Sequence, residues 1–134
     1  MITGIPKSEF QERARRVQAE LARRGLDALL TFGNEAEPQF VRYLSDYWPA
    51  FESAGVLVPV QGDPVLLIGP ESLTYAQSRS QIKEIRQVLE YRESSEPEYP
   101  GKKLDTFSSV FDEVSSGRGV KRLGVVGYPV TSAP

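Results

Sequence analysis

The carboxylates most able to do chemistry in this chain lie close together in the sequence. They are Glu35, Glu37, Asp46 and Glu52. Two carboxylates brought together could chelate a hard cation or act as a general acid and a general base. Their spacing matches no established metal-binding loop such as the EF-hand, so we expect a solvated acidic rim. We assign no catalytic residue and no metal ligand in this chain.

Histidine and cysteine are both absent from the sequence. Their absence excludes a Ser-His-Asp triad, a histidine or thiolate zinc site, a cysteine nucleophile and disulfide bonds. Most hydrolase mechanisms are therefore excluded, although carboxylate catalysis is not.

Aromatic side chains are concentrated in "YLSDYWPAFESAG", residues 43–55. The candidate site residues of this stretch are Tyr43, Asp46, Tyr47, Trp48, Phe51 and Glu52. Rings beside acids are typical of interface anchors and of lids over ligand sites. The alternative is that one or two rings fold back onto the edge of the sheet. We predict that at least two of Tyr47, Trp48 and Phe51 are substantially exposed.

Two other patterns are more typical of structure than of binding. Gly33 follows an apolar run, but "FGNEAEP" lacks the further glycines and the lysine of a phosphate-binding loop. Arginines at 13, 15, 16, 23 and 24 alternate with glutamates at 9, 12 and 20. This spacing predicts an exposed helix face held by ion pairs rather than a surface for nucleic acid.

Length and charge limit the class of protein and its partners. The 134 residues suit one domain, and the net charge of −2 comes from 16 basic and 18 acidic residues. This balance argues against nucleic acid and membrane surfaces as partners. No signal peptide is recognisable, and no apolar run reaches the ~20 residues that cross a bilayer. We expect a cytoplasmic protein.

The first part of the chain predicts a helix followed by a buried strand. Residues 8–24 carry apolar positions at helical spacing, with Ser8 as the expected cap and Gly25 as the stop. Residues 26–32 read as a buried strand, and residues 38–45 as a short helical turn.

The second part predicts a hairpin, further helices and a last strand. Apolar runs at 54–60 and 64–69 flank the turn residues "QGDP", and Pro59 places its strand near an edge or a bulge. A helix is expected to begin near Pro70, a strand to occupy part of 82–91, a surface loop 92–103, a helix 104–116 and a short buried strand 122–128. The fold class is therefore α/β, a single domain with a mixed sheet of about five strands centred on residues 27–32 and flanked by helices.

Three stretches in a fixed order carry a resemblance to a known family. They are "RARRVQAELARRGLDALLTFG", "NEAEPQFVRYLSDYW" and "AGVLVPVQGDPVLLI". From about Phe10 to Tyr128 the chain resembles the N-terminal domain of creatinase, prolidase (Xaa-Pro dipeptidase) and aminopeptidase P. Tyr43, Leu44 and Ser45 match the family motif residue by residue. Asp46 stands where the family most often has glycine, so a positive φ is not required there.

The resemblance implies a ribonuclease H-like domain over residues 1–134, cut before its last elements. Family members continue into a catalytic domain with the pita-bread fold, which holds two divalent metal ions (Mn, Co or Zn). None of that domain is present here, so this chain alone is expected to bind no cofactor and to catalyse nothing.

The resemblance also implies a role for the aromatic stretch. The N-terminal domain of this family supports a homodimer and walls the active site, often that of the neighbouring subunit. The loop that does so corresponds here to residues 46–53. The implied partners are the C-terminal catalytic domain of the same polypeptide and a second subunit.

Several parents remain possible under this resemblance. A prolidase-like Xaa-Pro dipeptidase is preferred, with an aminopeptidase P or a creatinase-type enzyme as alternatives. A free-standing small α/β ligand-binding module, with a pocket where the first strand ends at Gly33, is the alternative from another class.

Overall fold

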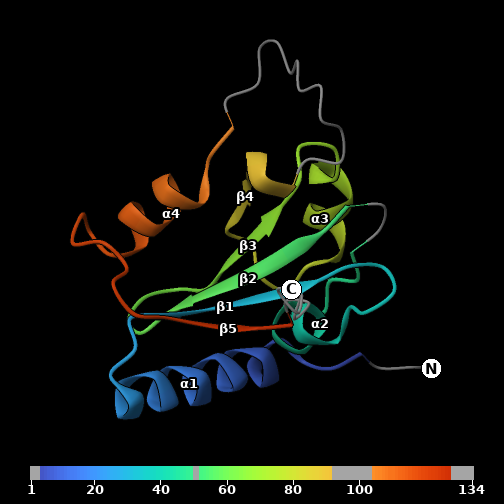
Figure 1. Ribbon diagram of the computed structural model, residues 1–134. Helices are drawn as coiled ribbons and strands as arrows, with labels where there is room; N and C mark the ends of the chain where they lie inside the picture. Colours follow the sequence, from blue (N-terminus) through green and yellow to red (C-terminus); the bar gives the residue numbers. More distant parts are fainter. Residues whose placement is uncertain (1–3, 50–51, 92–103, 128–134) are drawn as a thin grey trace, which may run out of the picture.

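A mixed sheet of five strands forms the centre of the fold (Figure 1). The structure is a computed structural model that describes residues 4–49, 52–91 and 104–127. In chain order the elements are α1 (Lys7–Arg24), β1 (Ala28–Gly33), α2 (Gln39–Ser45), β2 (Ala54–Pro59), β3 (Val65–Ile68), α3 (Leu73–Arg79), β4 (Ile85–Gln87), the 3₁₀ helix η1 (Leu89–Tyr91), α4 (Phe107–Val114) and β5 (Leu123–Val126). The predicted α/β fold with a mixed five-stranded sheet is confirmed. The predicted loop at 92–103 and the residues after Gly127 lie outside the described part.

The order of the strands is β4-β3-β2-β1-β5. The β1–β2 and β2–β3 pairs are antiparallel, whereas β1–β5 and β3–β4 are parallel. The prediction that the sheet centres on residues 27–32 is wrong, because β5 alone lies beyond β1 while β3 and β4 both lie beyond β2. The predicted hairpin of β2 and β3 and the strand within residues 82–91 are confirmed.

The strands bury side chains on both sides of the sheet, as alternation along each strand requires. On one side Val56 and Leu66 pack in a cluster with residues of α1, α2 and α3. On the other side Leu57 and Leu67 pack in a cluster that α4 covers. Each strand of the hairpin, β2 and β3, therefore contributes side chains to both clusters.

The two long predicted helices pack against the sheet as expected. In α1, Phe10 and Leu21 are buried, and Val17 packs partly buried on the core. In α4, Phe107 and Phe111 are partly buried against the opposite cluster. On the outer face of α1 the arginines form the predicted ion pairs with Glu9, Glu12 and Glu20. Hydrogen bonds from Arg23 and then Arg24 lower the pKa of Glu20 to about 2.

The sequence predicts where α1 ends but not which residue caps its start. Gly25 adopts the left-handed conformation (φ 66°) and ends the helix, as predicted. The predicted Ser8 cap is wrong, because Pro6 is the N-cap and no side chain caps this end. The Pro6 carbonyl accepts the first helical hydrogen bond, from the Glu9 amide at 3.0 Å.

The helix predicted at 104–116 is shorter, and its start has a physical cause. Asp105 is extended beside β4 and η1, exchanging backbone hydrogen bonds with Gln87 and Leu89 (2.8 and 3.0 Å). Thr106 then caps α4 in a reciprocal capping box with Ser109. The helix therefore begins at Phe107.

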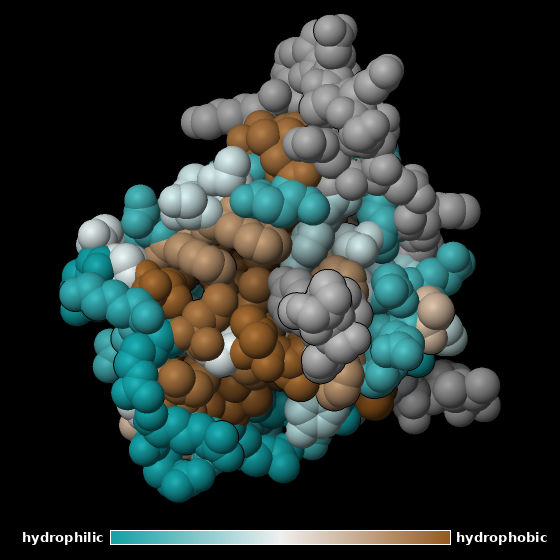
Figure 2. All heavy atoms as spheres, viewed as in Figure 1, coloured by the Kyte–Doolittle hydropathy of each residue, from teal (hydrophilic) through white to brown (hydrophobic). Residues whose placement is uncertain are grey.

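Two predictions about strand position are corrected by the sheet order. Pro59 lies in the central strand rather than in an edge strand, at the end of β2 beyond the residues that pair with β3. The predicted buried strand at 122–128 is the half-exposed edge strand β5. Val125 pairs with Leu30, faces the α4 side of the sheet and is 58% exposed. Figure 2 shows apolar side chains gathered between α4 and α1 on this side.

No helix in the described ranges could cross a lipid bilayer.

Candidate interaction surface

The helix α2 and the residues after it place the candidate rings at the end of β1. The buried face of α2 consists of Val41, Leu44 and Ser45. Tyr43 lies on the opposite face, points away from the sheet and has 49% of its surface exposed. The helix ends at Asp46, whose amide donates to the Arg42 carbonyl at 2.8 Å.

Asp46 takes the left-handed conformation, with φ 61° and ψ 10°. The sequence-based view that aspartate removes the need for a positive φ here is therefore wrong. Aspartate is among the few residues with a side chain that tolerate this region. The loop thus keeps the turn that glycine would allow.

Tyr47 lies in the core, so the predicted exposure of at least two of the three rings rests on Trp48 and Phe51. It is 1% exposed, and its ring centroid lies 5.6 Å from that of Tyr75. The Ser45 hydroxyl accepts a hydrogen bond from the Tyr47 amide at 3.0 Å and donates to the Val41 carbonyl at 2.6 Å. These bonds turn the chain inward after α2. Burial raises the pKa of Tyr47 to about 12, although the nearby Ser72 hydroxyl acts to lower it.

Trp48 is exposed, as predicted, with 48% of its surface accessible. Its neighbours Tyr47 and Pro49 are both fully buried, so the chain is anchored on each side of the ring. The indole Nε1 donates to the Glu35 carbonyl at 3.0 Å, and the Arg42 guanidinium lies 4.8 Å from the ring centroid. Phe51, the third ring of the prediction, lies outside the described residues.

A second arginine covers Tyr43. The Arg13 guanidinium lies 4.5 Å from the Tyr43 ring centroid, and its Nη1 donates to the Tyr43 carbonyl at 2.7 Å. We call Tyr43 and Trp48, with Arg13 and Arg42, the aromatic surface. Its rings are accessible but held in place, an arrangement typical of residues that contact a partner.

The predicted carboxylates do not form one cluster. Glu35 and Glu37 are exposed, as a solvated rim requires, and Asp46 is half-buried with its Oδ1 3.8 Å from the Arg42 Nη2. Glu52 is 5% exposed, so its placement in that rim is wrong. In the described part of the chain no group of three potential ligands could hold a metal ion.

Glu52 is buried against the start of α3. Its carboxylate accepts hydrogen bonds from the Ser72 hydroxyl and, at 3.4 Å, from the Glu71 amide. Burial is the main cause that raises the pKa of Glu52 above its ordinary value.

Sequence reasoning missed the residues that hold the predicted ones in place. Arg42 could have been found, because it lies four residues before Asp46 on the same helix. Ser72 has no local sequence signal, since only the fold brings the start of α3 to Glu52 and Tyr47.

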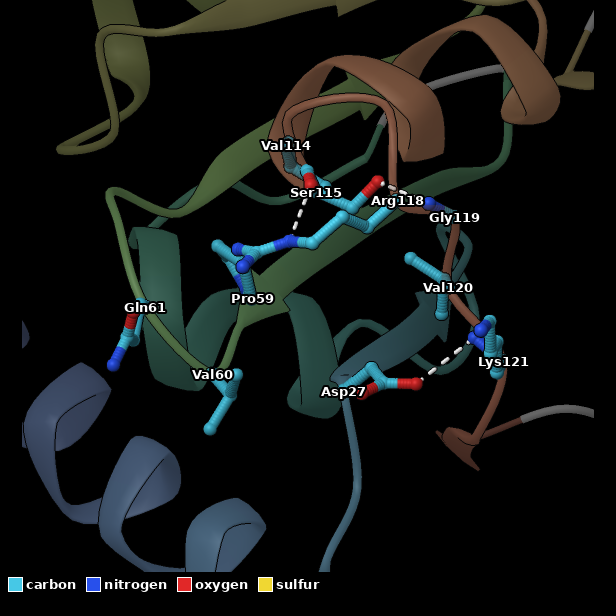
Figure 3. A pocket seen from close by; sticks show the side chains of 10 residues that line it. All are labelled: Asp27, Pro59, Val60, Gln61, Val114, Ser115, Arg118, Gly119, Val120 and Lys121. Atoms are coloured by element: carbon cyan, nitrogen blue, oxygen red, sulfur yellow. Dashed lines mark hydrogen bonds between the residues drawn. The ribbon is translucent and has the colours of Figure 1, made fainter.

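A separate cavity of about 410 Å³ lies at the opposite end of β1 (Figure 3). Asp27 precedes the strand, and its Oδ2 accepts hydrogen bonds from the Lys121 and Arg122 amides at 2.9 Å each. These bonds, that of Arg122 first, lower the pKa of Asp27. Arg118 donates through Nε to the Ser115 carbonyl at 3.2 Å. The Asp27 bonds join the α4–β5 connection to the start of β1, whereas the Arg118 bond lies within that connection. Neither contact supplies a nucleophile or an acid-base pair.

Solved structures share this fold, whereas no curated protein sequence matches the chain. The N-terminal domain of the cytoplasmic peptidase PepQ from Mycobacterium tuberculosis H37Rv is 28% identical, with a TM-score of 0.50 over 58% of this chain and 56% of that one. The creatinase/prolidase-like N-terminal domain of a protein assigned as a metallopeptidase from Corynebacterium diphtheriae is 19% identical, with a TM-score of 0.52 over 93% and 98%.

A whole enzyme also shares the fold. The prolidase from Pyrococcus horikoshii OT3 is 16% identical, with a TM-score of 0.52 over 85% of this chain and 32% of that one. This chain therefore spans about a third of the prolidase and about half of the PepQ structure.

The family model of the creatinase/prolidase N-terminal domain matches residues 13–131. This match includes β1, α2, the aromatic surface and the hairpin, and with the shared fold it establishes that the chain belongs to the creatinase/prolidase N-terminal domain family.

Proposed function

We propose that this chain is the noncatalytic N-terminal domain of a metal-dependent Xaa-Pro dipeptidase. In this proposal its aromatic surface contacts a second subunit and helps to wall the active site. The catalytic domain belongs to the same polypeptide and holds two divalent metal ions (Mn, Co or Zn). The whole enzyme is a cytoplasmic homodimer.

The observation that carries the proposal is Trp48. A ring that is 48% exposed adds little to the core, yet an indole hydrogen bond, an arginine and two buried neighbours hold it in place. Fixing an exposed aromatic side chain costs conformational entropy, and that cost is offset when a partner covers the ring. The same argument applies to Tyr43 under Arg13.

The chemistry of the chain supports a noncatalytic role. It has no histidine or cysteine, and the carboxylate of its buried acid Glu52 is bound by Ser72 and Glu71. Family membership supports a peptidase parent, and the prolidase among the structural relatives supports the Xaa-Pro class. An aminopeptidase P or a creatinase-type parent would use the same domain.

A ligand-binding module is the second candidate, and one observation favours it. A shallow cavity of about 390 Å³ lies just beyond β1, lined by Asn34, Glu35, Ala36, Glu52 and Ser53. Gly33 itself leaves no room for a ligand, because a Cβ there would lie 2.9 Å from the Val41 side chain. A small molecule copurifying with the chain would support this candidate.

The experiment that tests the proposal is substitution of Trp48 in the longer enzyme. We expect Trp48→Ala to lower kcat/KM for an Xaa-Pro dipeptide or to weaken the dimer measured by sedimentation. Trp48→Phe, which keeps a ring but loses the indole donor, should have the smaller effect. If both variants kept wild-type kinetics and assembly, the proposed role of the aromatic surface would be wrong.

A further inference from the structure

Glu52 connects the segment after the aromatic surface to the body of the domain. It is 5% exposed, and its carboxylate is bound by the Ser72 hydroxyl and the Glu71 amide at the start of α3. A buried carboxyl group is costly unless its oxygens are satisfied, so these bonds decide where the segment lies.

The position after β3 is shaped to receive this carboxyl group. A Cβ at Gly69 would lie 2.1 Å from the Glu52 Oε2 and 2.5 Å from the Tyr91 carbonyl oxygen. No side chain fits in that space. The absence of a side chain at Gly69 therefore lets Glu52 reach Ser72 and Glu71.

The same serine reaches the other side of the aromatic segment. Ser72, whose hydroxyl donates to Glu52, also lies beside the Tyr47 phenol. Tyr47 directly precedes Trp48, and Tyr47 and Pro49 are both fully buried. Ser72 thus joins the residue before the exposed ring to the carboxyl group that follows it in the chain.

Burial favours the neutral form of Glu52 and outweighs the Ser72 hydroxyl and the Glu71 amide, which donate to its carboxylate and lower its pKa. Glu71 hydrogen-bonds with it and repels its charge, the phenols of Tyr47 and Tyr75 lie on the loop and on α3, and Tyr91 lies behind Gly69. Within the described ranges no lysine or arginine forms an ion pair with Glu52. Burial first, and Glu71 in addition, raise the pKa of Glu52.

We infer that Glu52 is a positioning residue: through Ser72 it fastens the segment that carries Trp48 to the residues just before α3, and a negative charge on Glu52 loosens that segment. The functional importance of this coupling between Glu52 and the Trp48 segment rests on the proposed role of the aromatic surface. The coupling itself can be measured in this chain alone. Because the folded-state pKa is raised, the stability contributed by neutral Glu52 is fully present below the unfolded pKa. It is lost as the pH rises through the folded pKa.

The test uses Trp48 as a reporter, since it is the single tryptophan of the chain. Its fluorescence and its quenching by acrylamide are followed from about pH 4 to about pH 8, the range where a shifted glutamate titrates. We expect one transition with a midpoint above 4.5, the ordinary value for glutamate, and more quenching on the high-pH side.

Two variants assign the transition, and two more serve as controls. Glu52→Gln, neutral at every pH, should lose it, and Ser72→Ala should lose the change in quenching because the hydroxyl that binds the Glu52 carboxyl group is gone. Glu37→Gln, at an exposed carboxylate before α2, should keep the wild-type profile. Asp46→Asn should also keep it, which separates Glu52 from the carboxylate that pairs with Arg42.

A transition that persists in folded Glu52→Gln, or a wild-type profile with no transition, would overturn the inference. If Glu52→Gln did not fold, the wild-type and Ser72→Ala profiles would still decide it. Failure of the proposed function looks different: Trp48→Ala would then leave the longer enzyme unchanged while the pH transition remained in this chain.

Discussion

At the scale of the residue, contacts with other parts of the chain decide which side chains of residues 43–55 are buried and which are exposed. Tyr47 and Glu52 are inside the domain and Trp48 is outside, although the three lie within one short stretch. The sequence shows that rings and acids are concentrated here. It cannot show the division, because Ser72 and Gly69 come from another part of the chain and meet this stretch only in the fold.

Gly69→Ala tests the close approach of Glu52 to the turn after β3. The added methyl group would collide with the Glu52 carboxylate and with the Tyr91 carbonyl, so we expect a loss of about 1–3 kcal/mol in the free energy of unfolding. Urea unfolding measures it. Gly4→Ala is the control, because nothing lies within 4 Å of a Cβ there. Equal stability of the two variants would contradict the packing described here.

Asp46 tests the left-handed turn that ends α2. Because its φ is 61°, a β-branched residue should be strained, and we expect Asp46→Val to cost about 1–2 kcal/mol in unfolding free energy. Asp46→Gly should stay close to the wild type, since glycine adopts this conformation freely. Thermal unfolding of the two variants makes the comparison, and a valine variant as stable as the glycine variant would show that the turn is not left-handed.

At the scale of the element, apolar periodicity predicted nearly every helix and strand, while local hydrogen bonds set their ends. The amphipathic pattern of residues 8–24 and the "QGDP" turn both indicated the correct elements, because burial of one face follows directly from spacing. Ser8 and Leu104 were misplaced as helix starts, since Pro6 and the Thr106 capping box decide those ends. The centre of the sheet could not be predicted, because it depends on which edge β5 joins.

The two helix starts can be compared directly. Thr106→Ala removes the acceptor for the Ser109 amide (3.1 Å), so we expect a loss of about 1 kcal/mol in unfolding free energy. Ser8→Ala changes a residue with no capping bond, so its unfolding free energy should stay within about 0.5 kcal/mol of the wild type. Chemical denaturation of both variants gives the result. A larger loss for Ser8→Ala would mean that α1 begins with the predicted cap after all.

At the scale of the whole molecule, the proposed role is that of a folded support for the aromatic surface. We expect this chain to hydrolyse no Xaa-Pro dipeptide with added Mn, Co or Zn. It lacks histidine, and among its described residues no three carboxylates lie close enough together to hold a metal ion. A coupled assay of released proline measures this. Metal-dependent turnover that copurifies with the chain and disappears when one of its own acids is replaced would contradict the noncatalytic role.

The most direct test of the central claim, that the Trp48 ring serves a partner rather than the core, is a paired measurement on Trp48→Ala. In this chain the variant should change the unfolding free energy by about 1 kcal/mol or less, because half of the ring is already in solvent. In the longer enzyme the same variant should reduce kcat/KM or dimer affinity about tenfold or more, as the loss of a buried interface anchor does. The claim would be contradicted by the opposite pair of results: an unfolded or strongly destabilised chain, together with a longer enzyme whose folded form keeps its kinetics and its dimer.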